Sequence, residues 1–216
     1  MLESLVYAGV VFVGFSAIMN PLSAIPIFLT LVGNKSEEKS REIAFKSVLT
    51  AFVIVFTFAL AGQLFLNIFG ISFTALRLAG GALVVLIGYE MLQGKQSMVT
   101  SPSQEVIEKT KQEETSVAFA PLGTPLLAGP GVIITAMNFA TGSFYHFFIT
   151  ILAFGLLCGI TYFVFISGKD IKRMLGISRL KVLTKMMGLV LMVIGVQMLI
   201  EGFYAVIQEM PNSHYF

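Results

Sequence analysis

The sequence predicts an all-α integral membrane protein, with six transmembrane helices in a 3+3 inverted-topology repeat and with broken first and fourth helices. Three observations carry this prediction: an apolar composition, a one-sided distribution of cations, and two matching proline pairs in the two halves of the chain. Of the 216 residues, 56% are hydrophobic and only 12% are charged, whereas a soluble domain carries about 25% charged residues.

Six stretches are long enough to cross a hydrocarbon core about 30 Å thick, which needs about 20 apolar residues in a helix. The first has no cationic segment before it, so it is predicted to be a retained span and not a signal peptide. Polar linkers follow the first, third and fifth spans. The predicted spans cover residues 4–32, 44–66, 73–93, 116–140, 144–167 and 182–207.

The cations lie on one side of this predicted topology. Of the 14 Lys and Arg residues, all but Arg77 fall in or beside the first, third and fifth loops. Because cytoplasmic loops carry the excess of Lys and Arg, the sequence predicts a multi-pass protein of the inner or plasma membrane with both termini outside. The cations are spread over short loops between helices, so no nucleic acid partner is expected.

A polar loop divides the chain into two similar halves within one membrane domain. The first three-helix repeat is predicted over 1–94, a cytoplasmic linker over 95–115, and the second repeat over 116–216. Gly81–Leu92 and Gly188–Leu199 are identical at five of twelve aligned positions. Because each unit holds three spans, the second copy must enter the membrane upside down, as in many secondary transporters.

Each half also carries two prolines five residues apart inside an apolar span: N-P-L-S-A-I-P at 20–26 and T-P-L-L-A-G-P at 124–130. Proline removes a backbone donor and clashes with the preceding turn of a helix. Asn and Thr are favoured N-caps, and proline is favoured at the first helical position. The motifs therefore predict half-helices that begin inside the membrane, capped by Asn20 and Thr124; the alternative is that the prolines only kink their helices.

Half-helix N-termini inside a membrane must face protein or a water-filled cavity, and they suit an anion such as a carboxylate. Carbonyls freed at the ends of the preceding half-helices suit an ammonium group, so the two breaks together predict a site for a small, neutral zwitterion. The predicted substrate-binding residues are Asn20, Pro21, Leu22, Ser23, Ala24, Thr124, Pro125, Leu126, Leu127, Ala128 and Gly129. The amides expected to hold the carboxylate are those of Leu22, Ser23, Leu126 and Leu127.

Four other polar residues lie in or near the spans. Glu90 and Gln197 are equivalent in the two repeats and are candidates for coupling or gating, because ionisable groups at membrane depth are functional candidates; alternatively, Glu90 is an interfacial residue that reaches water. Arg77 and Glu201 are predicted to pair near the outer side. The sequence holds no nucleotide-binding loop, nucleophile elbow or zinc-protease motif, so no enzymatic activity, metal or cofactor is expected.

The early N-P motif, followed by P-L-L-A-G-P-G at 125–131, resembles the MarC family of integral membrane proteins. The resemblance extends over essentially the whole chain, including its length, its six spans and its charged central loop. It implies an inner-membrane transporter of small neutral amino acids such as glycine and alanine, with proton dependence. For the coupling ion itself, H+ and Na+ both stay open. The implied substrate contacts fall on Asn20–Ala24 and Thr124–Gly129.

The leading hypothesis is therefore a secondary transporter of a small neutral amino acid that works by alternating access. Two alternatives stay open: export of another small metabolite, and a non-transporting membrane scaffold or regulator. An intramembrane enzyme is less favoured, because no paired catalytic groups emerge from the sequence.

Overall fold

The computed structural model describes residues 2–33, 35–94 and 127–209, and the regular structure in these residues is helical. The prediction of an all-helical chain is therefore confirmed. Several of the described helical segments are long and apolar enough to cross a membrane. They are Ser4–Val32, Glu37–Gly62, Phe73–Leu92, Phe144–Ile166 and Ser178–Gln208.

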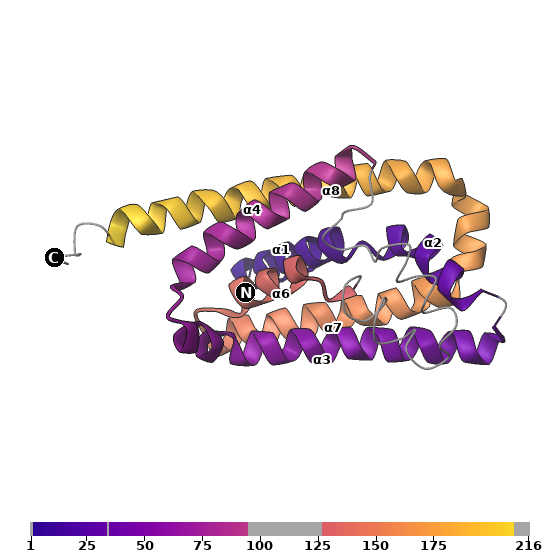
Figure 1. Cartoon of the computed structure of the whole chain (residues 1–216), viewed down its shortest axis with the longest axis horizontal. Helices are drawn as coiled ribbons and strands as arrows, with labels where there is room; N and C mark the ends of the chain where they lie inside the picture. The colour runs from indigo at the N-terminus through magenta and orange to yellow at the C-terminus, as the bar shows by residue number, and fades with distance from the viewer. Residues whose placement is uncertain (1, 34, 95–126, 210–216) are drawn as a thin grey trace.

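Two helix pairs frame the bundle. In Figure 1, α4 (Phe73–Leu92) and α8 (Gly168–Glu209) run side by side along the upper edge of the molecule. The second pair, α3 (Glu37–Phe69) and α7 (Phe144–Ile166), runs along the lower edge. These pairs leave a middle layer between them, which holds the three shorter helices.

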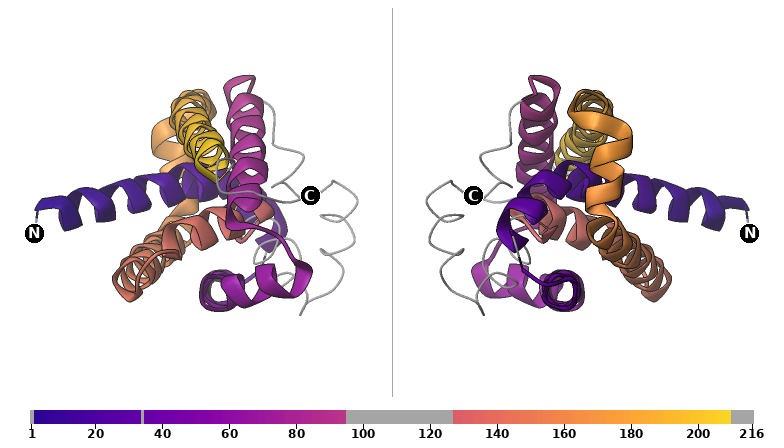
Figure 2. Two further views of the ribbon diagram at one scale, coloured as in Figure 1. Left: turned by 90° about the vertical axis from the view of Figure 1, so that its left-hand side faces the viewer. Right: turned by 90° about the vertical axis from the view of Figure 1, so that its right-hand side faces the viewer.

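The middle layer contains α1 (Leu2–Met19), α2 (Pro21–Val32) and α6 (Pro130–Ala140). Figure 2 shows that the N-terminal part of α1 projects from the side of the bundle. Leu5 and Val6 in this part are 73% and 60% exposed, as suits side chains that contact lipid. The C-terminal end of α1 is buried and leads directly into the break that precedes α2.

The first span is broken at Asn20, as the sequence predicts. Asn20 adopts the left-handed conformation with φ 38° and ψ 70°, so α1 ends at Met19 and α2 begins at Pro21. Asn20 is the one non-glycine residue with positive φ in the described parts of the chain. Asn visits this region more readily than most residues because its short polar side chain can bond locally.

The break in the second half lies one proline later than its counterpart. Helix α6 begins at Pro130 with Gly129 as its N-cap, so it starts at the second proline of its motif, whereas α2 starts at the first. Gly129 has extended backbone angles, φ −65° and ψ 167°, which is the region that the residue before a proline favours. Thr124 lies outside the described residues together with Pro125 and Leu126, so its predicted cap stays a prediction.

Helix α3 begins seven residues before the span predicted at 44–66. The Ser36 side chain accepts a hydrogen bond from the Lys39 amide at 3.2 Å, and Glu37 and Glu38 occupy the first turn. An N-cap serine and acidic first-turn residues both stabilise a helix start. Hydropathy detects only the apolar part of such a helix.

Helix α8 also extends beyond its predicted span, because most of the polar loop expected at 168–181 is helical. A kink at Gly176, with φ 71° and ψ 162°, divides the polar first part from the apolar part that begins at Ser178. The charged residues of the first part indicate that this part of the helix lies outside the hydrocarbon region. They do not indicate an irregular loop, which is why the predicted span began too late.

Glycines bring α4 and α8 into close contact. A Cβ atom at Gly88 would lie 2.7 Å from the Gly188 carbonyl oxygen, and one at Gly81 would lie 2.9 Å from the Gly195 carbonyl oxygen. Since the residue numbers rise along α4 as they fall along α8, the two helices are antiparallel. Small residues at such positions let membrane helices approach backbone to backbone.

Candidate functional site

The break at Asn20 is buried and only partly satisfied. Asn20 is 4% exposed, and its Oδ1 accepts a hydrogen bond from the Ser23 amide at 3.3 Å. The Asn20 carbonyl accepts from the amides of Ser23 and Ala24 at 3.1 and 3.3 Å. The Ser23 amide, which the sequence offers to a carboxylate, is therefore occupied by Asn20 in this structure.

The remaining atom of the Asn20 side chain has no such partner. Its Nδ2 is buried and has no hydrogen-bond partner in the structure. Around it, Pro21 and Ala24 are buried, while Leu22 and Ser23 are half-buried. An amide nitrogen donates two hydrogen bonds, so Asn20 keeps free donor capacity in the interior of the bundle.

The break in the second half exposes a helix N-terminus to the interior of the protein. Leu127, Ala128 and Gly129 are buried and Pro130 is exposed, and the N-cap Gly129 has no side chain that could cap the first amides of α6. Gly131 and Val132, in the first turn of α6, are buried as well. The first amides of a helix lack intrahelical acceptors and carry a partial positive charge, so this end of α6 suits an anion.

The two breaks approach each other. A Cβ atom at Gly131 would lie 3.7 Å from Ile18 Cγ2, and Ile18 and Gly131 are each two residues from their break. The Thr161 hydroxyl on α7 lies 3.8 Å from the Met19 sulfur, so α7 closes the same region. Residues more than 100 positions apart in the sequence therefore form one buried region.

Two hydroxyl groups near this region were not predicted from the sequence. The Oγ of Ser16 and the Oγ1 of Thr135 are both buried without a hydrogen-bond partner in the structure, and Thr135 is 0% exposed. Ser16 lies one helical turn before Asn20, and Thr135 lies one turn after Gly131. The four-residue spacing of Ser16 and Asn20 places both on one face of the chain, and this spacing is the signal that could have indicated Ser16.

Unpaired polar atoms in the interior are costly and uncommon. A buried polar group without a partner costs about 1–3 kcal/mol, and most such groups in proteins find partners. The polar set of this site consists of Ser16 Oγ, Asn20 Nδ2 and Thr135 Oγ1. Its three atoms provide donors and acceptors for a small polar ligand or for water, next to the uncapped end of α6.

Glu90 and Gln197 do not come together. Gly88, two residues before Glu90, packs on Gly188, whereas Gly195, two residues before Gln197, packs on Gly81. The two candidates thus lie toward opposite ends of the α4–α8 contact. Glu90 Oε2 is buried and unpartnered, while Gln197 is exposed and donates to Glu201 at 3.0 Å.

The predicted Arg77–Glu201 pair is confirmed. An Arg77 guanidinium nitrogen lies 3.5 Å from Glu201 Oε2, and Arg77 Nε donates to Asn138 Oδ1 at 3.0 Å. The guanidinium also lies over the Phe73 ring, 5.0 Å from its centroid. Arg77 thereby connects α4 to both α6 and α8.

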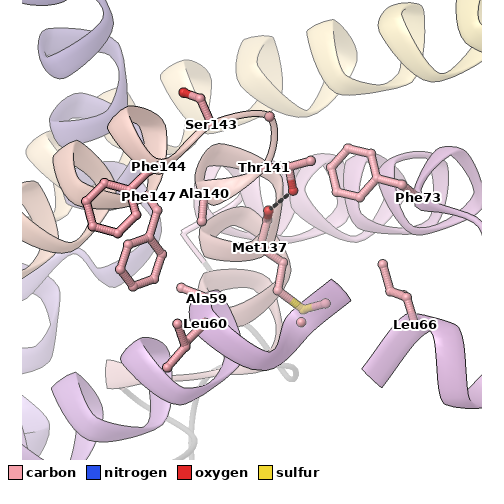
Figure 3. A pocket seen from close by; sticks show the side chains of 12 residues that line it. Ala59, Leu60, Leu66, Phe73, Met137, Ala140, Thr141, Ser143, Phe144 and Phe147 are labelled. Atoms are coloured by element: carbon pink, nitrogen blue, oxygen red, sulfur yellow. Dashed lines mark hydrogen bonds between the residues drawn. The ribbon is translucent and has the colours of Figure 1, made fainter. Parts of the chain in front are cut away.

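Two cavities lie at opposite ends of the bundle. The first, of about 370 Å³, is lined by residues of α3, α6 and α7. Figure 3 shows Phe144, Phe147, Met137 and Leu66 around it, with the Thr141 hydroxyl bonded to the Met137 carbonyl. The second, of about 230 Å³, lies where α2 ends, α3 begins and α7 meets α8.

The fold and the site together define a class: a helical multi-pass integral membrane protein with two helix breaks that meet inside the bundle. The model of the family described as "MarC family integral membrane protein" matches this chain over residues 5–207. The chain therefore belongs to the MarC family.

Similar proteins occur in archaea and bacteria. A UPF0056 membrane protein of Pyrococcus horikoshii is 40% identical over 94% of this chain and 96% of its own length. The UPF0056 inner membrane protein MarC of Escherichia coli is 33% identical over 96% of this chain and 99% of its own length. The YvbG membrane protein of Bacillus subtilis is 32% identical over 89% of this chain and 92% of its own length. No solved structure matches the chain.

Proposed function

We propose that this protein is a secondary transporter of small neutral amino acids of the glycine and alanine type, acting without enzymatic chemistry or a bound cofactor. The observation that carries the proposal is the polar set of Ser16, Asn20 and Thr135, buried without partners beside the uncapped end of α6. These groups lie within the bundle, between cavities at its two ends.

The chemistry of the region fits a zwitterion. Asn20 Nδ2 and the first amides of α6 would donate to the carboxylate, whose charge the N-terminal end of α6 favours. The hydroxyls of Ser16 and Thr135 would accept hydrogen bonds from the ammonium group, as would the free carbonyls at the end of α1. The apolar neighbours Leu127 and Ala128 leave a charged substrate side chain without a partner.

A 3+3 inverted repeat is part of this proposal, and the glycine contacts support it. The sequence alignment pairs Gly81 with Gly188 and Gly88 with Gly195. A rotation that maps each repeat onto the other would place the Gly81–Gly195 contact on the Gly188–Gly88 contact. Both contacts are present. Such an exchange is expected for a two-fold axis in the membrane plane, which is the symmetry of inverted repeats.

The proposal also includes an inner-membrane location and an orientation of the termini. The Escherichia coli relative is named an inner membrane protein, and the cation distribution favours both termini outside. Alternating access would come from rocking of one repeat against the other around the breaks. H+ or Na+ would be the coupling ion, with Glu90 and Gln197 as candidates for coupling or gating.

Uptake of labelled glycine into proteoliposomes tests the proposal. We expect saturable uptake under an imposed H+ or Na+ gradient, inhibited by alanine and not by lysine or glutamate. We expect the Pro21→Ala, Pro130→Ala double variant to lose most of this uptake, because α2 and α6 begin at these prolines and a proline at the first helical position fixes where the helix starts. No saturable flux under any gradient would refute transport of glycine, and full flux in the double variant would refute the broken-helix site.

A further inference from the structure

The cavity between α2 and α3 has a charged rim and an aromatic floor. We call it the charged cavity: its rim carries Glu37, Arg41, Lys169 and Asp170, and its floor includes Phe28 and Phe165. The rim residues are exposed, and none of these four charges forms an ion pair within the described chain. Charges of both signs around one opening suit the approach of a small zwitterion.

Phe28 and Phe165 form a stacked pair at the floor of this cavity. Their ring centroids are 4.4 Å apart, and their planes differ by 9°. Phe28 is 2% exposed and Phe165 is 1% exposed. The rings come from different elements, α2 and α7, so a relative movement of these helices would separate them.

The stacked pair lies between the charged cavity and the two helix breaks. On α7, Thr161 contacts Met19 beside the break; Phe165 is one turn further, at about 6 Å along the axis, and Ile166 and Ser167 line the cavity. On α2, Phe28 follows Asn20 by eight residues, or about 12 Å of helix rise. Both helices thus run from the break, past the ring pair, to the charged cavity.

Helix α2 is bounded by two backbone turns. Asn20 has φ 38° at its start, and Gly33 has φ 52° at its end. Within the helix, Pro26 has no N–H for the backbone ladder, and its carbonyl accepts a hydrogen bond from the Thr30 hydroxyl at 2.8 Å. A twelve-residue helix between two such turns can change its tilt by rotation at its ends, and hinges of this kind are common in domain and lid movements.

On the other side of the break, aromatic packing is denser. The Phe15 ring lies 5.9 Å from that of Phe139 and 5.0 Å from that of Phe154, measured between centroids. Tyr7 packs edge-on against Phe139 at 6.4 Å, and its hydroxyl donates to the Phe139 carbonyl. This cluster joins α1, α6 and α7. Toward the charged cavity, the described ring contacts between helices are the Phe28–Phe165 stack and an edge-on contact of the exposed Phe45 with Tyr162, and of these the Phe28–Phe165 stack is the buried one.

We propose that the Phe28–Phe165 pair is a gate, and that tilting of α2 opens a path from the charged cavity to the buried polar set. The charged cavity is then the entrance through which a small zwitterion reaches the breaks from that side. The cluster around Phe15 stays closed when the gate opens, so the two sides are not connected at once. The nature of the solute rests on the proposed function, while the gate itself is tested without any solute.

Thiol accessibility measures the opening directly. Cys158 is the single cysteine in the sequence, so Cys158→Ser provides a thiol-free background. In that background Ser16→Cys places a reporter beyond the gate, and Ser40→Cys places one in the charged cavity, which Ser40 lines. A charged, membrane-impermeant methanethiosulfonate reagent is added to one face of proteoliposomes at a time, and the face from which Ser40→Cys reacts identifies the side of the charged cavity.

We expect slow modification of Ser16→Cys from that side and an increase of about tenfold on adding Phe28→Ala, because an open state populated at about 1% would rise to about 10%. The milder Phe28→Leu should give a smaller increase. Phe154→Ala is the matched control: it removes the same ring on the other side of the break and should leave modification from this side unchanged. Each variant must first show the size-exclusion profile of the unmodified background, so that misfolding is separated from gating.

The two possible failures are distinguishable. An unchanged rate in both Phe28→Ala and Phe28→Leu would overturn the gate, as would an equal rise in Phe154→Ala, even if glycine uptake is observed. A rise confined to the Phe28 variants would support the gate even if no glycine flux is found, in which case the proposed solute and not the path would be wrong.

Discussion

Asn20 has two roles in the break between α1 and α2. Its backbone takes the left-handed conformation that separates α1 from α2, and its Oδ1 caps the Ser23 amide. Its Nδ2 stays buried and unpaired in the structure. Backbone and side chain can be separated by substitution, because glycine accepts positive φ at no steric cost while alanine does not.

We expect Asn20→Ala to lower the free energy of unfolding by about 1–2 kcal/mol, because it loses the cap and strains the backbone. Asn20→Gly should lower the free energy of unfolding by only a few tenths of about 1 kcal/mol, since glycine is a tolerated N-cap. The buried thiol of Cys158 makes the reaction with a thiol-reactive dye a measure of thermal unfolding. A glycine variant less stable than the alanine variant would contradict the role assigned to the backbone.

Thr135 should be dispensable for stability. Its hydroxyl is buried without a partner, so Thr135→Val removes an unsatisfied group and keeps the shape of the side chain. We expect the thermal midpoint to stay equal or to rise, by an amount equivalent to as much as about 1 kcal/mol. The matched control is Thr161→Val, which loses a 2.7 Å hydrogen bond to the Leu157 carbonyl; a larger loss in Thr135→Val than in this control would show that Thr135 is structural.

At the scale of single elements, the α4–α8 crossing depends on the absence of side chains. An added Cβ at Gly88 would lie 2.7 Å from a backbone oxygen and 2.8 Å from the Met192 amide nitrogen, and backbone cannot move aside as a flexible side chain can. The separation of the two helix axes therefore depends on glycine at this position.

Gly88→Ala should lower stability by about 1–3 kcal/mol, the usual cost of overpacking. Gly159→Ala, in the middle of α7, is the matched control, since a Cβ there meets nothing within 4 Å. Its helix propensity should make it neutral or slightly stabilising. Thermal unfolding in detergent compares the two variants, and equal midpoints would contradict close packing at the crossing.

The elements that the sequence predicts best are those with abrupt ends. The span predicted at 73–93 is observed as Phe73–Leu92, and the span at 144–167 as Phe144–Ile166. Ser72 and Ser143 cap these helices, so the change in hydropathy and the change in backbone coincide. At α3 and α8 the helix continues into polar residues, where apolar periodicity carries no information about the backbone.

The candidate site was predictable only in part. The proline after Asn20 marked the first break, because proline constrains the local backbone. The spacing of four residues from Asn20 could have indicated Ser16. The unpaired state of Thr135 depends on tertiary packing, and no local pattern distinguishes its hydroxyl from those of Thr150 and Thr161, which bond to carbonyls of their own helix. The second break could not be placed from spacing alone, since α6 begins at Pro130 and not at the first proline of its motif.

At the scale of the whole molecule, the proposed topology places consecutive loops on alternating sides of the membrane. In the Cys158→Ser background, Glu38→Cys and Lys169→Cys should react with an impermeant thiol reagent only from the cytoplasmic face. Ile71→Cys and Tyr145→Cys should react only from the outer face, and all four positions are exposed. Labelling of intact cells against inverted vesicles separates the faces, and a split within either pair would contradict the inverted repeat.

The central claim is that the polar atoms at the two breaks hold a small zwitterion. Equilibrium binding of labelled glycine to the purified protein tests this claim most directly, with Asn20→Gly as the variant and the lipid-exposed Leu189→Ala as its control. We predict saturable binding to the wild type and to Leu189→Ala, and an affinity weaker by about tenfold in Asn20→Gly, the loss expected for one buried hydrogen bond of about 1.4 kcal/mol. Equal affinities in all three proteins would contradict the claim.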